Sequence, residues 1–368
     1  MILPNYIREL KRNGIGLDVD GYSNVALKYL EDKRNNYLRE LSALVGVELT
    51  FDNGLQIVRA FLNRGIRLER MNQEYLKERQ DDCREVFLLY KAKEYEQKLH
   101  AYSLDKLVEH MGSDGRIRAD WYIANNTTGR LICRAPALQG MPSYCRQFFK
   151  PDDGYCFVTI DFSTIEMRVL ARISGDGRLI RELQEGCDIH RQTASVVFGK
   201  SLEEVNNEER QVGKAVGFMV VYGGSAVGLS KKLSNLGVEC SVEDAQIMIS
   251  SFYQKHLDVA YYHHDLRKGI IKPTTINGQV FEGLTGSKAL NYPVQASAAE
   301  GFKLTLTEIV KRKPEQYKLV MAIHDSITLE VPAEEKATAE SFLKSTAEEV
   351  MGSFLSPVPV FAEIKTQI

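Results

Sequence analysis

Four residues at intervals of four are two cations and two aromatic residues, which are types that can bind a ligand. Arg210, Lys214, Phe218 and Tyr222 lie in the segment NNEERQVGKAVGFMVVYGG, whose pattern predicts a helix. Each step of four drifts by only about 40° around a helix, so two cations and two aromatic rings share one stripe. Such a stripe can bind a polyphosphate at its cationic end and hold a base or sugar against its rings. The alternative is an amphipathic helix with its rings in the core and its cations reaching solvent.

The elements around two aspartates place each of them at the end of a strand. The run YCFVTIDFS is rich in β-formers and IEMRVLARISG has helical spacing, so we expect Asp161 where a strand hands over to a helix. The run KLVMAIHDSITLEVP predicts a tight hairpin with Asp325 at its turn. A lone aspartate at such a position is usually a cap or a turn residue, and catalysis is the other interpretation.

Helical and loop-rich stretches alternate along the rest of the chain. Residues 21–110 follow a helical pattern, whereas residues 112–143 are rich in Gly, Pro, Asn and Thr, as in short strands and loops. Residues 176–270 are again mostly helical, and a closing helix is expected after Pro332. In the first stretch cations interleave with acids, which is typical of a solvated face, although such a face could also grip a nucleic-acid backbone. These cations are Arg59, Arg64, Arg67, Arg70, Lys77 and Arg79.

Composition excludes several classes of protein. With 368 residues, 44% hydrophobic and 26% charged, the chain has room for two or three domains and is not disordered, collagen-like or a coiled-coil rod. The net charge of −2 gives no overall basic field, so a nucleic-acid partner would need a local cluster of Lys and Arg. No run approaches the roughly 18 apolar residues of a membrane span, and the start lacks a signal peptide's apolar segment. We expect a soluble, cytoplasmic protein.

The cysteines and two adjacent histidines predict no metal site. The six cysteines contain no CxxC pair and no zinc-type spacing with histidine, which fits a reducing compartment. His263 and His264 are neighbours and therefore diverge on a helix. We expect both to be exposed polar groups rather than metal ligands.

Several segments together resemble one family. Arg210, Lys214, Phe218, Tyr222 and Gly223 resemble the fingers-helix motif of family A DNA polymerases. DFSTIEMRVLARISGD (161–176) is similar to the first palm motif of that family, and HDS (324–326) lies where the second would be. Further segments that resemble the family are TGRL (128–131), LQGMP (138–142), DIH (188–190) and NYPVQASAAE (291–300). The resemblance runs from about Arg8 to the C-terminus. In its N-terminal part, the general helical pattern is similar rather than individual residues.

The resemblance implies an α+β, right-hand polymerase fold with a helical thumb, an antiparallel-sheet palm and helical fingers. The predicted boundaries are 1–112 for the mostly helical thumb and the lead-in to the palm, 113–180 for the first part of the palm, 181–285 for the fingers, and 286–368 for the second part of the palm. A proofreading 3′–5′ exonuclease domain would need roughly 100 or more further residues before this region. We therefore expect a polymerase core without proofreading.

The resemblance assigns catalysis to the two aspartates and a lysine. Nucleotidyl transfer needs a deprotonated primer 3′-hydroxyl and a stabilised α-phosphate, which two Mg²⁺ ions roughly 3.5–4 Å apart can provide. Hard cations prefer oxygen ligands, so Asp161, Asp325 and the backbone carbonyl of Phe162 are the implied metal ligands, with Mn²⁺ as an alternative ion. Lys214 is the implied acid that protonates the leaving pyrophosphate.

The resemblance also implies a nucleotide site. Lys214, Arg210 and His190 would hold the triphosphate. Phe218 would stack on the incoming nucleotide, and Tyr222 would lie at the templating position or the sugar pocket. Glu166 would close the pocket over the sugar 2′ position and exclude ribonucleotides by a clash; the alternative is a glutamate on a solvated helix face. The implied nucleotide-binding residues are Arg210, Lys214, Phe218, Tyr222, His190 and Glu166.

Contacts to DNA are implied for four residues. Arg130, Asn291 and Gln295 resemble residues that read minor-groove acceptors at the primer terminus, which every correct base pair presents. His324 resembles the residue that contacts the primer end. The alternatives are loop and helix-cap roles for the first three and a plain hairpin histidine for His324.

Two positions depart from the family pattern. Ser326 stands where many bacterial members place a Glu, which puts a third carboxylate near the metals in doubt. Ser287 stands where many carry an Arg, so that primer contact is missing or has moved to Lys288.

The predicted function is template-directed addition of deoxynucleoside triphosphates to a primer 3′-hydroxyl, in replication or repair in a bacterial or phage-infected cell. The expected partner is primer–template DNA, with no membrane contact, a monomeric chain and accessory proteins that are not identified. One alternative is a single-subunit RNA polymerase, which Ser326 favours and which Glu166 and Phe218 disfavour. Another is a non-catalytic DNA-binding accessory protein, which the presence of both aspartates and Lys214 disfavours.

Overall fold

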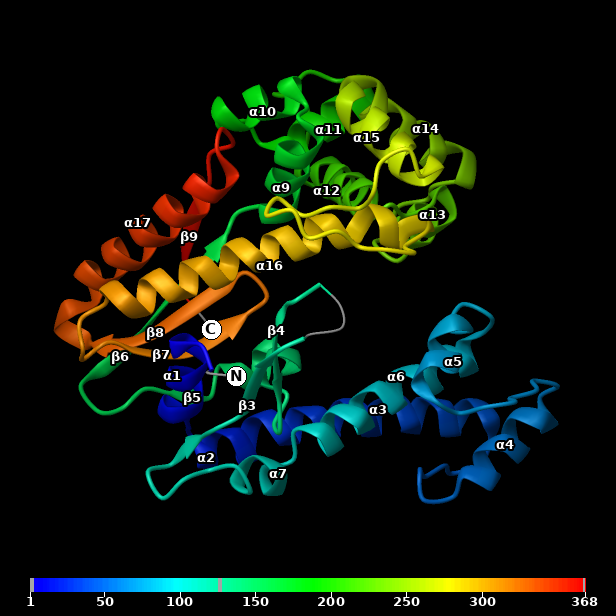
Figure 1. Ribbon diagram of the computed structural model, residues 1–368. Helices are drawn as coiled ribbons and strands as arrows, with labels where there is room; N and C mark the ends of the chain where they lie inside the picture. Colours follow the sequence, from blue (N-terminus) through cyan, green and yellow to red (C-terminus); the bar gives the residue numbers. More distant parts are fainter. Residues whose placement is uncertain (1–2, 125–127, 367) are drawn as a thin grey trace. The chain divides into compact units, whose positions relative to one another are not determined.

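The computed structural model describes residues 3–124, 128–366 and 368, and its chain divides into two compact units (Figure 1). The larger unit is made of Met1–Glu9, Trp121–Ile132 and Gly154–Gln367. The smaller unit is made of Leu10–Asp120, Cys133–Asp153 and Ile368. The chain therefore crosses between the units several times, and each unit is assembled from segments that are distant in sequence.

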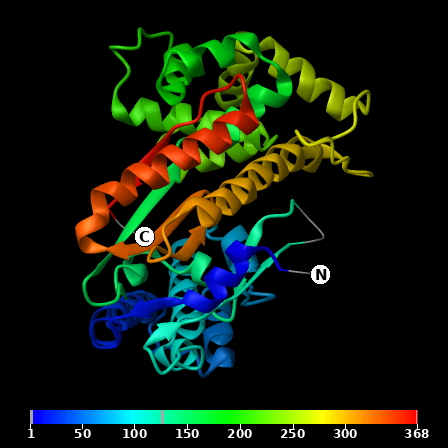
Figure 2. The same ribbon diagram turned by 60° about the vertical axis from the view of Figure 1, so that its left-hand side comes forward.

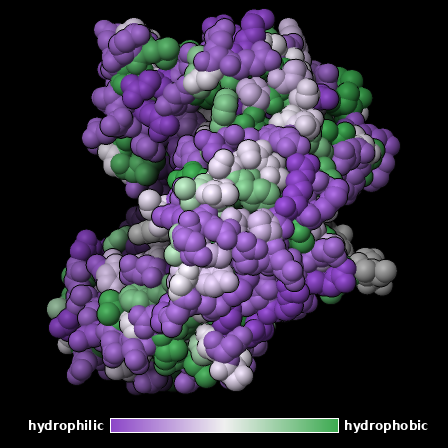
Figure 3. Space-filling view, turned by 90° about the vertical axis from the view of Figure 1, so that its left-hand side faces the viewer, coloured by the Kyte–Doolittle hydropathy of each residue, from purple (hydrophilic) through white to green (hydrophobic). Residues whose placement is uncertain are grey.

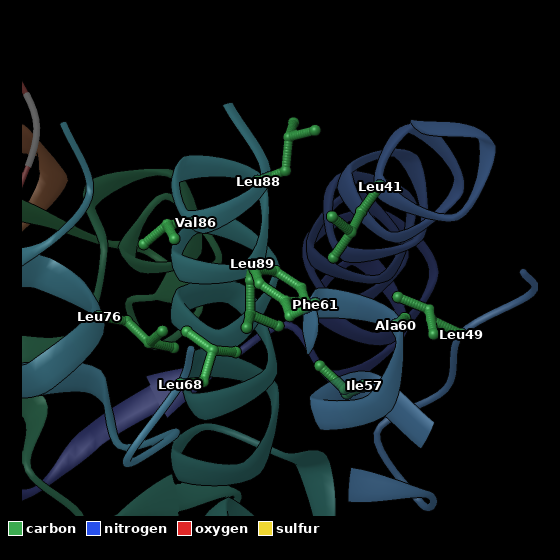
Figure 4. Packing of buried hydrophobic residues seen from close by; sticks show 10 residues of the cluster. All are labelled: Leu41, Leu49, Ile57, Ala60, Phe61, Leu68, Leu76, Val86, Leu88 and Leu89. Carbon is green, nitrogen blue, oxygen red and sulfur yellow. The ribbon is translucent and has the colours of Figure 1, made fainter. Parts of the chain in front are cut away.

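The smaller unit is built on two long helices, α3 (Lys28–Val45) and α6 (Arg84–Ala101), which pack side by side (Figure 1). Asparagine side chains cap the shorter helices α4 (Gly54–Asn63) and α5 (Gln73–Glu78), since the Asn53 and Asn72 oxygens accept hydrogen bonds from the backbone N–H groups of Gln56 and Tyr75. One hydrophobic cluster joins all four helices (Figure 4). Its buried members are Leu41, Leu49, Ile57, Ala60, Phe61, Leu68, Leu76, Val86, Leu88 and Leu89. The predicted helical character of residues 21–110 is confirmed.

Short elements complete the smaller unit. Strands β2 (Arg116–Ile117), β1 (Ile15–Leu17) and β5 (Phe149–Lys150) form an antiparallel three-stranded sheet in that order. The short helical elements are α2 (Val19–Gly21), a π-helical turn (Tyr22–Leu27), α7 (Leu104–Val108), a 3₁₀ turn (Leu138–Gly140) and α8 (Ser143–Arg146). Helix α1 (Asn5–Asn13) and the strand pair β3 (Asp120–Ile123) and β4 (Leu131–Arg134) each span a boundary between the units in sequence.

The larger unit is centred on a four-stranded antiparallel sheet in the order β7–β8–β6–β9. Its strands are β6 (Tyr155–Phe162), β7 (Lys318–Ile323), β8 (Ser326–Pro332) and β9 (Ala362–Lys365). β7 and β8 form the predicted hairpin, with His324 and Asp325 at its turn. Helix α17 (Lys336–Leu355) packs on β6, β8 and β9, and α16 (Gly286–Arg312) packs on α17 and α9 (Figure 2). The closing helix after Pro332 is thus confirmed, and the sheet holds Asp161 on β6 beside Asp325, which lies in the turn directly before the adjoining strand β8.

The remaining helices of the larger unit run from the end of β6 to the start of α16. They are α9 (Ile165–Ser174), α10 (Gly177–Gln184), α11 (Ile189–Phe198), α12 (Asn207–Val221), α13 (Ala226–Ser234), α14 (Val242–Lys255) and α15 (Leu257–Lys268). A short 3₁₀ turn (Ala333–Glu335) precedes α17. The α+β class and the helical character of residues 176–270 are confirmed.

The prediction that both adjacent histidines are exposed is wrong for His263. His264 is exposed, but His263 is completely buried, and its Nδ1 lies 2.9 Å from the Tyr253 hydroxyl. Burial, with the positive charge of Arg267 second, lowers the pKa of His263 to about 3. Because α15 packs against α14, α9 and α16, its inner face enters the core while the neighbouring position, about 100° away, stays in solvent.

Hydrophobic residues on the face drawn in Figure 3 form small separate patches among hydrophilic ones. Scattered exposed apolar side chains of this kind are normal for a globular surface. Among the helices that the structure describes, none is long and apolar enough to cross a membrane.

Candidate active site

Asp161 and Asp325 meet at one end of the β6–β8 pair. Asp161 lies directly across from Ser326, and the backbone N–H of Phe162 donates to the Asp325 carbonyl oxygen at 3.2 Å. His324 turns the hairpin with a left-handed backbone (φ 54°), which presents Asp325 toward β6. The two carboxyl groups are close enough to hydrogen-bond with each other. The sheet therefore brings together two aspartates that lie more than a hundred residues apart in the chain.

The environment of the aspartate pair favours a bound cation. Burial, and next the charge of Asp161, raise the pKa of Asp325 to about 7. Burial also raises the pKa of Asp161, and the Lys365 ammonium opposes that rise. Two neighbouring carboxylates cannot both ionise easily unless positive charge lies between them, and oxygen donors of this type suit Mg²⁺. Within the described ranges, no third His, Cys, Asp or Glu completes a metal cluster with this pair.

A pocket of about 470 Å³ in the larger unit opens on this pair. Most of the predicted site residues line it: Arg130, Asp161, Phe162, Glu166, His190, Lys214, Phe218, Tyr222, His324 and Asp325. Arg210, Asn291 and Gln295 are not among its lining residues. Asn291 and Gln295 lie on α16, and that helix lines the pocket with Ala298, Ala299 and Phe302, about one to three turns further on.

Helix α12 carries the predicted stripe. It begins with a capping box, in which Asn206 and Glu209 satisfy each other's backbone N–H groups, and Tyr222 follows its last turn. Gly213 allows α12 to approach α11, because a Cβ there would lie 2.2 Å from the carbonyl oxygen of His190. The Phe218 and Tyr222 rings are 6.0 Å apart and nearly parallel. The helix and the positions of the two rings on one stripe are as predicted, whereas the stacking of the two rings on each other was not predicted.

The cationic end of the stripe is organised by Asp188, a residue that was not singled out from the sequence. Asp188 caps α11 by accepting from the backbone N–H groups of His190 and Arg191, and its other oxygen accepts from Arg210 Nε at 2.6 Å. Burial alone would raise the pKa of Asp188, but the Arg210 hydrogen bond and the α11 amide lower it. Burial, with the charge of Arg210 second, lowers the pKa of His190 to about 4. At neutral pH, His190 therefore offers a neutral ring beside the two cations, and Lys214 Nζ lies 5.8 Å from the centre of the Phe218 ring.

Glu166, which is buried, joins the partly buried Arg130 and Tyr222 in a hydrogen-bonded network. A left-handed residue, Thr164 (φ 52°), turns the chain from β6 into α9 and places Glu166 in the first turn of that helix. Glu166 Oε1 accepts from Arg130 Nη2 at 2.6 Å, and Oε2 accepts from the Tyr222 hydroxyl. Burial, and then the hydrogen bond to Glu166, raise the pKa of Tyr222. Glu166 is only 9% exposed, so the alternative of a glutamate on a solvated face is excluded.

Comparison with known proteins identifies the family. The model of "DNA polymerase family A" matches residues 55–367. The chain belongs to DNA polymerase family A. The predicted right-hand polymerase fold is also confirmed, because the POL domain of Pol1 from M. smegmatis, solved in complex with DNA primer–template and dNTP, superposes with a TM-score of 0.79 at 22% identity, over 98% of this chain and 68% of that one.

Bacterial members of the family are similar over most of the chain. DNA polymerase I of Aquifex aeolicus is 34% identical over 272 residues, which are 72% of this chain and 47% of that protein. DNA polymerase I of Caldicellulosiruptor bescii is 30% identical over 316 residues, 79% of this chain and 36% of that protein. The thermostable DNA polymerase I of Thermus aquaticus is 32% identical over 272 residues, 68% of this chain and 32% of that protein. The chain thus spans less than half the length of these relatives.

Three further charged residues near the family motifs were missed. Lys232 of α13 places its Nζ 5.6 Å from the centre of the Phe218 ring, which also faces Lys214. Lys365 of β9 lies 3.8 Å from Asp161 and is bonded to Glu363. These side chains come from elements outside the motifs, so no local spacing could have indicated them.

Proposed function

We propose that this chain performs template-directed addition of deoxynucleoside triphosphates to a primer 3′-hydroxyl. The proposal is carried by one observation, which is that the Asp161–Asp325 pair and the Lys214–Phe218–Tyr222 stripe line a single pocket. Membership of DNA polymerase family A supports it. Segments 1–112, 113–180, 181–285 and 286–368 are proposed as thumb, first palm part, fingers and second palm part.

The aspartate pair is proposed to hold two Mg²⁺ ions, with Mn²⁺ as a substitute and the Phe162 carbonyl as a further ligand. When bound, Mg²⁺ supplies activation of the primer hydroxyl and neutralisation of charge at the α-phosphate. The burial of Asp161 and Asp325 suits this role, since it raises the pKa of both carboxyl groups, and the charge of Asp161 raises that of Asp325 further.

The stripe on α12 is proposed to bind and orient the nucleotide. Lys214 neutralises the triphosphate and protonates the leaving pyrophosphate, while Arg210 and the neutral ring of His190 grip the outer phosphates. Phe218 stacks on the base, and Tyr222 lies against the templating position or the sugar pocket. Because Asp188 already pairs with Arg210, phosphate must compete with or join that contact.

Glu166 is proposed to exclude ribonucleotides by filling the space at the sugar 2′ position. The contacts to Arg130 and Tyr222 hold its carboxylate in the pocket, which supports a fixed obstacle. Glu166→Ala should therefore incorporate ribonucleotides more readily relative to deoxynucleotides. Unchanged selection between the two, measured by single-nucleotide insertion, would contradict this role.

Primer–template DNA is the proposed partner, bound by a monomeric chain. Arg130, Asn291 and Gln295 are proposed to contact the minor groove at the primer terminus, and His324 is proposed to contact the primer end.

We also propose that residues 1–368 carry no proofreading exonuclease activity. Incubation of a mispaired primer with the purified chain and no nucleotide tests this, because any shortening of the primer would contradict it.

Extension of a primed DNA template with deoxynucleotides or ribonucleotides, with and without Mg²⁺, tests the main proposal. We expect Mg²⁺-dependent extension with deoxynucleotides and its loss in Asp161→Asn and Asp325→Asn. Asp153→Asn is the matched control, since that aspartate is fully exposed outside the pocket. Extension by Asp161→Asn at the parent rate would refute the proposal, and preferential use of ribonucleotides would favour an RNA polymerase.

A further inference from the structure

Strand β9 places a cation beside the aspartate pair. In the antiparallel pairing of β6 with β9, Glu363 lies directly across from Asp161, and Lys365 lies across from Thr159. Directly opposed residues project from the same face of a sheet, as do residues two apart along a strand. Asp161, Glu363 and Lys365 therefore share one face, with Ser326 on the other flank of Asp161.

Lys365 contacts both acidic side chains on this face. Its Nζ lies 2.7 Å from Glu363 Oε2 and 3.8 Å from Asp161 Oδ2. A lysine side chain is a cation at neutral pH, and the hydrogen bond to Glu363 keeps this charge beside Asp161. The Lys365 side chain is 40% exposed and that of Asp161 is 35% exposed, so water screens the contact only in part. Lys365 thus acts as a counter-ion that belongs to the protein, anchored by Glu363.

The geometry points to Lys365 as a positioning residue that sets how tightly the Asp161–Asp325 pair binds a divalent cation, with Glu363 holding its ammonium in place. This inference rests on the proposed role of the two aspartates as metal ligands. The ammonium lies 3.8 Å from one oxygen of Asp161 and repels a second cation that approaches it. A unit charge at about 4 Å changes an equilibrium constant by about fivefold even at the dielectric constant of water, and a doubly charged ion feels twice that energy at equal distance.

A weakened metal site has a consequence for the order of binding. While the pocket holds no nucleotide, Lys365 offsets part of the negative charge of the two aspartates, so divalent cations bind weakly. A triphosphate brings several negative charges, which compensate for the ammonium and raise the affinity for the ion. The structure therefore favours entry of the metal together with the nucleotide rather than before it.

Binding of Mn²⁺ to the purified chain, without DNA or nucleotide, tests the inference directly. The electron paramagnetic resonance signal of free Mn²⁺ measures the dissociation constant. Lys365→Met removes the charge at similar length and should tighten binding by about fivefold for a single interaction energy and by up to about 25-fold for twice that energy. Lys365→Arg keeps the charge and should stay within about twofold of the parent. Lys272→Met is the matched control, because it removes the same charge from an exposed pair with Glu282 that does not line the pocket.

Two more variants separate this inference from the proposed function. Asp161→Asn should lose most Mn²⁺ binding; if it binds Mn²⁺ as the parent does, the proposed metal site itself fails. Glu363→Gln should weaken binding, because the ammonium then has only Asp161 as a partner. If Asp161→Asn loses binding while Lys365→Met binds no more tightly than the parent, the aspartate site stands and the role of Lys365 is overturned. The Mg²⁺ concentration for half-maximal primer extension should fall in Lys365→Met, in the same direction as the Mn²⁺ constant.

Discussion

Removing the Tyr222 hydroxyl tests whether the Glu166 network holds the pocket together. Tyr222 donates its hydroxyl hydrogen to Glu166 Oε2, and Arg130 binds the other carboxylate oxygen. Tyr222→Phe keeps the ring, and therefore its stacking on Phe218, and deletes only this hydrogen bond. The change is thus confined to one donor that faces a buried carboxylate.

The expected cost follows from the charge of the acceptor. A hydrogen bond to a charged group contributes about 1.5–3 kcal/mol to the free energy of unfolding, whereas one between neutral groups contributes about 0.5–1.5 kcal/mol. Tyr222→Phe should therefore cost about 1.5–3 kcal/mol in the parent and about 0.5–1.5 kcal/mol in a Glu166→Gln background. The difference of about 1 kcal/mol is the coupling between the hydroxyl and the negative charge.

Urea unfolding followed by circular dichroism measures the free energy of unfolding of the parent, Tyr222→Phe, Glu166→Gln and the double variant. Tyr22→Phe serves as the control, since the Tyr22 hydroxyl is buried in the smaller unit and donates to the Tyr102 carbonyl oxygen at 2.7 Å. Its cost should be the same with and without Glu166→Gln. The reasoning is refuted if Tyr222→Phe costs less than about 0.5 kcal/mol, or if its cost does not depend on the charge at position 166.

Three other outcomes are expected. Burial alone would raise the pKa of Asp176, but bonds to His256 and to a backbone amide lower it below 3.8. The ionised Asp176 therefore stabilises the folded chain above that pH. This stabilisation is lost as the pH falls through the folded-state pKa. The difference in unfolding free energy between the parent and Asp176→Asn should hence be largest near neutral pH and shrink below pH 3.8, as urea midpoints at several pH values would show. Gly213→Ala should destabilise the chain by about 2–3 kcal/mol and weaken nucleotide binding, because its Cβ would meet the α11 backbone. Gly352 on α17 has open space around it, so Gly352→Ala should stabilise the chain by about 0.5–1 kcal/mol. Thermal unfolding measures both changes. Lys214→Ala should lower the single-turnover rate at saturating nucleotide, and an effect on nucleotide affinity alone would remove its proposed role as an acid.

The elements that carry the site were predictable because their signals are local. A helical pattern and steps of four indicate α12, so its stripe of cations and rings follows from helix geometry alone. The strand before Asp161 and the hairpin around Asp325 have equally local signatures in alternation and turn residues. The motifs that contain them also indicated the family and its fold, which the comparisons confirm. The individual roles of the site residues stay predictions.

Other features depend on packing between elements that are distant in sequence. His263 is buried because α15 turns that face toward three other helices, and nothing in its own segment distinguishes it from exposed His264. The pairing of Asp188 with Arg210 and the approach of Lys232 to Phe218 join separate helices. Sequence spacing describes neighbours along one element, so it contains no information about such contacts.

The chain by itself determined its helices, its strand ends and the aspartates and cations that the family motifs hold, because these follow from short-range backbone preferences and residue order. Only the tertiary structure decided which charges face one another. The register of β9 against β6 sets Glu363 and Lys365 beside Asp161, and the turn into α9 places Glu166 between Arg130 and Tyr222. Electrostatic energy depends on distance through space and on burial, and both are properties of the folded chain.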